Sequence, residues 1–367
     1  MSSTPTSQIP PYRKILRELV PAEYLKPDNT HLWWLIPHFA LIFGCFALLN
    51  AFPVWWLYLT LPLVIGHSFG CLGFIAHEIC HGGAMPNKKL RHLLAGIAFS
   101  PFGIGPFLWS KWHNAEHHGH TQHADIDPDR LFLLEEYQNK PVLKWLYQRS
   151  KTARNLAIFG FYTLMMTEQN FTAMTRYLGN PEVSKKDKTT ILIEFILPNV
   201  FWIGLSLALG WQVLVFGYIV PMLVANFMVI SYISTNHFLN PLVDESDVLA
   251  SSLSVTLPKW LGWLDVLHSH FGAHVSHHLF PTAPSRHSRK VERIIAEQWP
   301  HLFHEMPITR ALKLLWDTPW IYDETGKALI DPHLHQVTPT LGNGLVHDPK
   351  IELQVREAAD LKNASIL

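Results

Sequence analysis

The sequence predicts an all-α integral membrane protein with four transmembrane helices in two hairpins and a cytoplasmic, histidine-rich helical cap. Three observations lead to this fold class. Only 16% of the 367 residues are charged, against roughly 25% in typical soluble domains. Long apolar runs are grouped in two pairs, and the chain has 23 histidines beside 29 lysines and arginines. The low charge content excludes a disordered chain and disfavours an ordinary soluble enzyme.

The four spans are predicted at 33–52, 54–76, 191–209 and 211–233. Each run approaches or exceeds the roughly 20 residues that cross a bilayer as a helix. The first two runs are joined at Pro53 and the last two by the short turn 210–212, so each pair is expected to form a hairpin. Four buried helices of a soluble protein are the alternative, but the polar remainder of the chain is too small to cover them.

The distribution of basic residues predicts the orientation. Both hairpin turns lack lysine and arginine, and the basic residues gather in three other regions: Arg13, Lys14, Arg17; Lys88, Lys89, Arg91, Lys185, Lys186; Arg286, Arg289 and Lys290. By the positive-inside rule these regions are cytoplasmic, as are both termini. We therefore divide the chain into a cytoplasmic arm (1–30), a membrane domain (31–300) and a cytoplasmic tail (301–367).

Two shorter apolar segments are distinguished from the spans by their length and by the helix-breaking residues within them. The apolar stretches 93–108 and 156–166 are too interrupted or too short to cross, so helices lying in the membrane interface are expected. From about residue 322 onward the tail is predicted as loop and short helix. The polar N-terminus has no apolar core of a cleavable signal peptide.

Charge and cysteine content exclude further classes. The 29 basic residues are balanced by 29 acidic ones, so no basic surface for nucleic acid is expected. Three cysteines are an odd number in a long chain, which argues against a disulfide framework.

Histidines cluster at three places on the predicted cytoplasmic side. The clusters are HEICH at 77–81, HNAEHH at 113–118 and HVSHH at 274–278. Residues four apart share one helix face, so His77 with His81, and His113 with His117, can present two imidazoles to one point. In the third cluster the histidines follow the i, i+3, i+4 pattern. The predicted metal ligands are His77, His81, His113, His117, His118, His237, His274, His277 and His278.

This number of histidines predicts two metal ions. One zinc takes four ligands in a structural site and three plus water in a catalytic site, so eight clustered histidines are too many for it. Two ions with several imidazoles each, beside a lipid phase, favour iron and O2 chemistry. Asp125, Asp127 and Asp129 are candidates for orienting the ligand rings; a solvated turn is the alternative interpretation.

Two other functions are compatible with part of the histidine pattern. The first cluster matches the HExxH signature of zinc proteases, but that site would leave the second and third clusters unexplained. A membrane carrier of metal or haem would place its ligands within the spans, whereas these clusters lie outside them. Neither function accounts for all three clusters.

The ordered set HxxxH, HxxxHH and HxxHH, with spans before the first box and between the second and third, resembles the integral-membrane fatty acid desaturases over about residues 31–300. Segment 112–114, Thr121 and segment 127–129 look like the second box of acyl desaturases related to the linoleoyl-CoA type, and 277–281 is similar to their third box.

The resemblance implies a cofactor and partners. It implies two iron ions, O2 as co-substrate, and an acyl-lipid, acyl-CoA or acyl-carrier substrate. The haem motif of a fused cytochrome b5 is missing, which implies a separate electron donor of ferredoxin or cytochrome b5 type. Glu78 and Asn236 stand where the family places residues supporting the ligands. Related enzymes with the same boxes hydroxylate or ketolate a lipid, and this alternative stays open.

Overall fold

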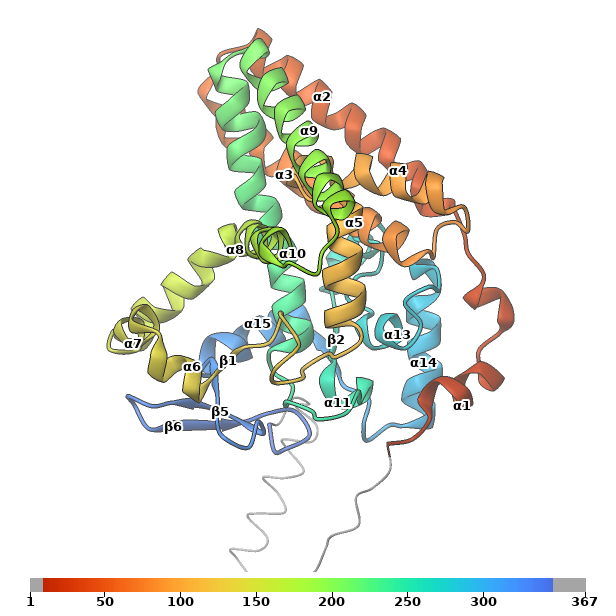
Figure 1. Cartoon of the computed structure of the whole chain (residues 1–367), viewed down its shortest axis with the longest axis vertical. Helices are drawn as coiled ribbons and strands as arrows, with labels where there is room; N and C mark the ends of the chain where they lie inside the picture. Colours follow the sequence, from red (N-terminus) through yellow and green to blue (C-terminus); the bar gives the residue numbers. More distant parts are fainter. Residues whose placement is uncertain (1–8, 346–367) are drawn as a thin grey trace, which may run out of the picture.

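The computed structural model describes residues 9–345, and four long apolar helices dominate it (Figure 1). The termini beyond these residues, including the end of the predicted tail, lie outside the described part. The helices long and apolar enough to cross a membrane are Thr30–Ala51, which includes α2 (Leu35–Ala51), α3 (Trp55–His81), α9 (Lys185–Leu209) and Val213–His237, which ends in α10 (Val220–His237). The prediction of four helices long and apolar enough to cross a membrane is confirmed.

Two of the spans extend beyond their predicted ends. Helix α3 continues past residue 76 to His81, where Gly82 ends it with φ 92°, a conformation that favours glycine. Helix α10 continues past residue 233 to His237. The polar residues at these ends interrupt the hydropathy pattern but not the backbone hydrogen bonding. The first histidine cluster and His237 are therefore held by the ends of spanning helices.

Helix α3 is central among the spans and packs against α2, α4 (Lys88–Phe99) and α10. Glycines let α3 and α10 approach closely: a Cβ atom on Gly66 would lie 2.5 Å from Val224 Cβ, and one on Gly70 would overlap the end of Met228. Small residues at such contacts are typical of helix packing in membranes.

The connector after α3 is a bent pair of helices that delivers the second histidine cluster. It runs through α4, a 3-10 turn at Ser100–Phe102, α5 (Pro106–Trp109) and a π-helix at Ser110–His117, with a 99° bend. Together the two arms are apolar enough to count as a fifth, broken span. Glu194 of α9 accepts the backbone N–H of Phe107 at 3.0 Å, and a side chain at Gly105 would collide with this carboxylate. The charge within α9 thus anchors the bend.

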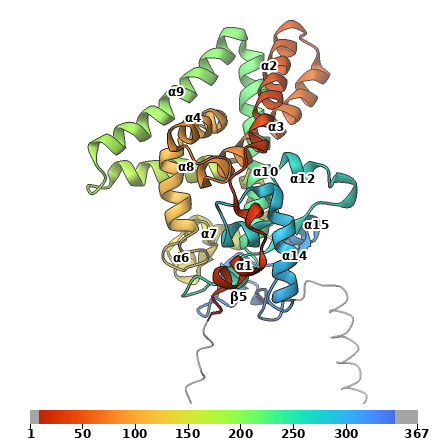
Figure 2. The same cartoon turned by 90° about the vertical axis from the view of Figure 1, so that its right-hand side faces the viewer.

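Helix α8 (Lys151–Gly179) is much longer than the predicted stretch 156–166, and it packs against α10. Figure 2 shows α8 and α4 crossing the direction of the spans. The remaining helices are α1 (Tyr12–Leu19), α6 (Leu134–Asn139), α7 (Pro141–Tyr147), α11 (Val248–Ser251), α12 (Leu264–Leu267), α13 (His274–Leu279), α14 (Ser288–Gln298) and α15 (Ile308–Asp317).

Two small sheets correct the all-α prediction. Strand β1 (Phe132–Leu133) pairs in parallel with β4 (Ile321–Tyr322), which continues antiparallel through β5 (Ala328–Asp331) and β6 (Gln336–Pro339). A second sheet pairs β2 (Ser254–Thr256) with β3 (Glu305–Pro307) in parallel. The segment expected to be loop from residue 322 therefore contains strands. Strands of two to four residues are too short to show a period-2 pattern in the sequence.

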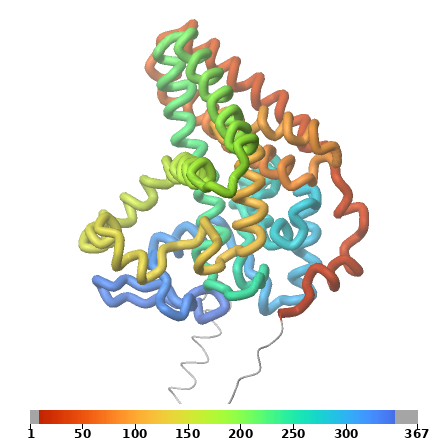
Figure 3. The backbone as a smooth tube through the Cα atoms, in the orientation of Figure 1, coloured from red at the N-terminus to blue at the C-terminus, as the bar shows by residue number. Residues whose placement is uncertain are grey.

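Distant parts of the chain meet below the spans. Helix α1, red in Figure 3, lies against α14, where Tyr12 and Leu16 share a buried cluster with Val291 and Ile295. Arg13 of α1 donates to the backbone carbonyls of His278 and Leu279. The N-terminal helix thus braces the third histidine cluster.

Candidate metal centre

All nine predicted histidine ligands converge in two adjacent sets. Within each set one ring nitrogen per residue lies within 4.8 Å of the others. The five-histidine set comprises His77, His81, His113, His118 and His277. The four-histidine set comprises His117, His237, His274 and His278. The rings of His118 and His278 stack across the two sets with centroids 4.2 Å apart, so the sets are neighbours.

The second and third clusters each serve both sets, which the helix-face argument did not predict. His113 and His118 belong to the five-histidine set, whereas His117 belongs to the other. The reason is the π-helix, in which the His118 N–H donates to the His113 carbonyl at 3.0 Å, five residues back. This wider turn aligns His113 with His118, while the rings of His113 and His117 still stack with centroids 5.0 Å apart and form a further possible metal group with Asp129. Such π-helical turns frequently occur at functional sites.

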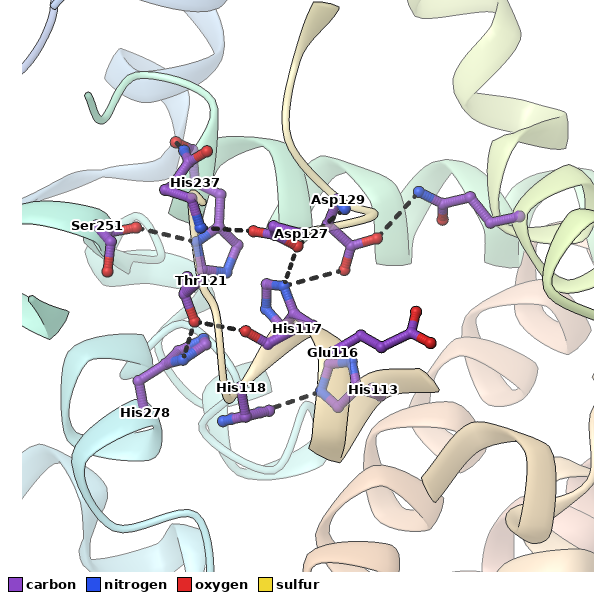
Figure 4. A network of polar contacts seen from close by, with 12 residues as sticks. His113, Glu116, His117, His118, Thr121, Asp127, Asp129, His237, Ser251 and His278 are labelled. Carbon is purple, nitrogen blue, oxygen red and sulfur yellow. Dashed lines mark hydrogen bonds and ion pairs between the residues drawn. The ribbon is translucent and has the colours of Figure 1, made fainter. Parts of the chain in front are cut away.

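Three rings of the four-histidine set are oriented by hydrogen bonds at Nδ1 (Figure 4). His237 Nδ1 donates to the Ser251 carbonyl at 3.2 Å, and His117 Nδ1 donates to Asp127 at 2.9 Å. The Thr121 hydroxyl donates to the His117 carbonyl, so its oxygen accepts from His278 Nδ1 at 3.1 Å. With protons fixed on Nδ1, the neutral rings of His237 and His278 present unprotonated Nε2 atoms to the interior of the set, and His117 would do so once a bound cation displaced its second proton.

The distances between these nitrogens fit a shared cation. His274 Nε2 lies 2.8 Å from His237 Nε2 and 3.0 Å from His278 Nε2. In the five-histidine set, the Nε2 atoms of His113 and His118 are 3.2 Å apart. His77 Nε2 lies 3.1 Å from His113 Nε2, and His277 Nε2 lies 3.1 Å from His118 Nε2. Two nitrogens each about 2.1 Å from one ion are about 3.0 Å apart at right angles and about 3.4 Å apart in a tetrahedron. The donor sets therefore suit metal ions with more than four ligands.

Aromatic packing surrounds the five-histidine set. The Trp109 indole stacks on His113 with centroids 4.3 Å apart and contacts the edges of His77 and His81 at 5.3 and 5.2 Å. Phe271 contacts His77 at 4.9 Å. Among the described residues, His81 Nε2 has no hydrogen-bond partner. An unpaired buried imidazole nitrogen is what a ligand to an ion would leave behind.

Carboxylates control the charge on one side of the centre. Although burial opposes a charged ring, Asp127 and then Asp129 raise the pKa of His117 to about 9. Burial, followed by neighbouring histidines, lowers the pKa of His277 to about 3 and holds that of His278 well below its usual range. Neutral imidazole is the form that ligates metal, and the two carboxylates would offset part of a cation's charge.

The other predicted supporting residues have different surroundings. Asp127 and Asp129 lie against His117, at 2.9 and 3.4 Å, whereas Asp125 is exposed and makes only a backbone contact with His123. The side-chain amide of Asn236 is buried without a partner among the described residues.

Glu78 is occupied elsewhere. Its carboxylate accepts the backbone N–H and hydroxyl of Ser285 at 2.9 and 2.7 Å and contacts His31 Nδ1 at 2.8 Å. It therefore lacks the free position that the water-activating glutamate of an HExxH protease requires. The roles of Ser251, Ser285 and His31 escaped the sequence analysis, because a backbone acceptor and single polar residues far apart in the chain carry no local signal.

Comparison with known proteins agrees with this geometry. The family model described as fatty acid desaturase matches residues 53–309. The chain is 24% identical over 300 residues to the sn-1 acyl-lipid omega-3 desaturase (ferredoxin) of Synechocystis sp., covering 79% of this chain and 82% of that protein. It is 24% identical over 341 residues to the Delta(12)-oleate desaturase of Trichosanthes kirilowii, covering 84% and 86%. The chain belongs to the fatty acid desaturase family.

Proposed function

We propose that the nine histidines hold two iron ions and that the enzyme introduces a double bond into an acyl chain with O2 and two electrons. The observation that carries this proposal is the convergence of nine imidazoles, from three separate boxes and the end of α10, into two neighbouring sets. Bound iron would supply the oxidising power needed to remove hydrogen from an unactivated methylene. Histidine suits this metal, and two sets suit a two-metal site.

The protein's own residues hold and shield the centre. Of the nine rings, only His118 and His277 are partly exposed, and the other seven are buried. The hydrogen bonds at Nδ1 fix which nitrogen faces inward, and Trp109 and Phe271 cover the five-histidine set with apolar surface. These contacts orient the ligands and exclude water.

We assign an acyl-lipid as substrate. A cavity of about 270 Å³ lies between α8, α9, α10 and the 102–108 segment, and its lining includes Phe102, Leu108 and Met174. Leu108 lines this cavity and immediately precedes Trp109, which stacks on His113, so one short segment connects the apolar cavity with the five-histidine set. The similarity to the Synechocystis sn-1 acyl-lipid omega-3 desaturase (ferredoxin) supports an acyl-lipid substrate and a separate ferredoxin-type donor here.

The proposed topology has two transmembrane hairpins with the histidine sets and both termini on the cytoplasmic side. Basic residues flank the ends of the spans nearest the histidines, and the turns 52–54 and 210–212 have none. Single cysteines placed in turn 210–212 and at Lys88, in a chain whose three native cysteines are replaced, should label from opposite sides in intact cells. Labelling of both from the same side would contradict this topology.

Expression in a host that lacks polyunsaturated lipids tests the function. Profiling of fatty acids by mass spectrometry, with location of the double bonds, should show a new unsaturated acyl chain in membrane lipids. A His117→Ala variant that still inserts in the membrane should make none. A hydroxylated or ketolated lipid would assign the chain to the related oxygen-inserting reaction, and no modified lipid in any acyl pool would contradict the proposal.

A further inference from the structure

A separate cluster of side chains that could bind a metal lies beside α3 and includes none of the nine histidines. His67 and Cys71 are one turn apart on α3, and His268 approaches them from the segment after α12. One potential ligand atom from each of the three residues lies within 4.8 Å of the others. The cluster is half-buried at His67 and buried at the other two residues.

The geometry of the cluster presents donors to a common point. His67 Nε2 and His268 Nε2 face each other at 3.0 Å. The Cys71 sulfur is 3.8 Å from both ring nitrogens of His67, so one S–H proton cannot be directed at both. His268 Nδ1 is 2.9 Å from the Tyr232 hydroxyl. With its proton on Nδ1, His268 donates to this oxygen and turns an unprotonated Nε2 toward His67, the arrangement found behind metal-ligating histidines.

We propose that His67, Cys71 and His268 bind one copper(I) ion. Thiolate and imidazole ligands select copper(I) and zinc among biological metals. Cys71 would lose its thiol proton to solvent when the metal binds, so thiolate and Cu⁺ together carry no net charge. Zn²⁺ would leave one uncompensated positive charge beside the apolar rings of Phe74 and Phe271, which lie around His268 and Tyr232. This site does not depend on the proposed desaturase reaction.

Titration of the purified full-length protein in detergent tests the site. Cu⁺ is added in competition with a chromophoric Cu⁺ chelator, and X-ray absorption at the copper edge identifies the ligands. Wild type should take one Cu⁺ with one sulfur and two nitrogen neighbours. Cys71→Ser should weaken this binding by more than about 100-fold, because a hydroxyl is a poor ligand for a soft ion. Cys45→Ser, which replaces another buried cysteine, should match wild type.

The readouts separate this site from the nine-histidine centre. Iron content and fatty-acid products should be unchanged in Cys71→Ser, which shows that the variant folds, while the sulfur signal is lost. His268→Ala should lose one nitrogen neighbour and retain the sulfur. Copper bound without a sulfur neighbour, or equal copper affinity in Cys71→Ser and wild type, would overturn the proposal even if desaturation is established. Failure of desaturation with an intact sulfur signal would leave the copper site standing.

Discussion

The two histidine sets are built by different means although they share two of the three boxes. In the four-histidine set, three rings are oriented by hydrogen bonds to Asp127, Ser251 and Thr121. In the five-histidine set, the hydrogen bonds that the structure shows for the rings join one ring to another, and Trp109 supplies the packing. One set is held by directed polar contacts, and the other by apolar surface.

This difference predicts that the two metal positions are unequal. Asp127 and Asp129 put negative charge beside the four-histidine set, which favours a cation there. The five-histidine set has two partly exposed rings, His118 and His277. We therefore expect the four-histidine position to retain its metal more tightly and the five-histidine position to be more open to exchange.

Removal of a ligand from either set should have the largest effect. His278→Ala and His277→Ala differ by one position in α13 but remove a ligand from different sets. Both should lower product formation by more than about 100-fold, because each ion loses a directly bound group. Iron analysis of the membrane-inserted variants should show greater loss in His278→Ala if the tighter position is the four-histidine set. Substantial product from either variant would remove that residue from the site.

The aspartates after the second box provide a matched pair. Asp127→Asn removes the charge that orients His117 and should weaken metal binding about 10 to 100-fold, as expected for a residue bonded to a ligand. Asp125→Asn is the same substitution two residues earlier in the chain, at an exposed position without contact to any of the nine histidines. It should retain wild-type iron content and product. Equal losses in the two variants would show that the effect comes from the loop and not from His117.

Part of the fold and of the candidate site could be predicted from the sequence. The spans followed from hydropathy, because a bilayer imposes one length on every crossing helix. The convergence of the nine histidines followed from their clustering in the sequence. The grouping of the histidines into two sets did not, because it depends on the π-helix that aligns His113 with His118. No residue type marks a π-helix.

The small sheets and the supporting contacts were equally invisible in the sequence. The Ser251 carbonyl acts through the backbone, so its side chain gives no signal. Strand β1 pairs with β4 across most of the chain length, and each has only two residues. Asp125, by contrast, had the right residue type and spacing but is turned to solvent. Which aspartate faces a histidine is decided by the path of the loop.

Chelation can distinguish the two positions directly. Incubation with a soluble iron chelator should remove metal in two phases, with about a tenfold faster loss from the five-histidine set, whose ligands His118 and His277 are partly exposed. Asp127→Asn should bring the two phases together by weakening the slower one. Time courses of bound iron in wild type and variant measure this. A single phase in wild type would mean that the positions are equivalent.

A hydroxyl-based contact should have a smaller effect. Thr121→Val deletes the oxygen that accepts the Nδ1 proton of His278 while keeping the side-chain volume. Product formation should fall by about tenfold, the lower end for loss of a ligand's supporting contact. Thr121→Ser keeps the acceptor and should restore most of the activity. If Thr121→Ser is as impaired as Thr121→Val, the methyl group and not the hydrogen bond supports the ring.

The smallest effect concerns the support beneath His274. Ser254 Oγ accepts the backbone N–H groups of His274 and Val275 at 3.1 Å each and donates to Glu292. Burial raises the pKa of Glu292 from 4.5 to about 7, although Arg289 partly opposes this. The folded state therefore favours the protonated carboxyl, and this stability is present below pH 4.5 and lost as the pH rises toward 7.

Between pH 5 and pH 8 this group should reduce the free energy of unfolding by about 1 to 3 kcal/mol. Glu292→Gln keeps a neutral group at the position and should show less of this decline. Thermal unfolding of the two proteins at several pH values isolates Glu292, because every other titrating group is common to both. Glu292 acts through Ser254 on the first turn of α13, the helix that carries His274 and His278 of the four-histidine set and His277 of the other. Parallel stability profiles would show that Glu292 has the same pKa in the folded and the unfolded chain. They would also show that its charge does not affect the hydrogen bonds from α13 to Ser254.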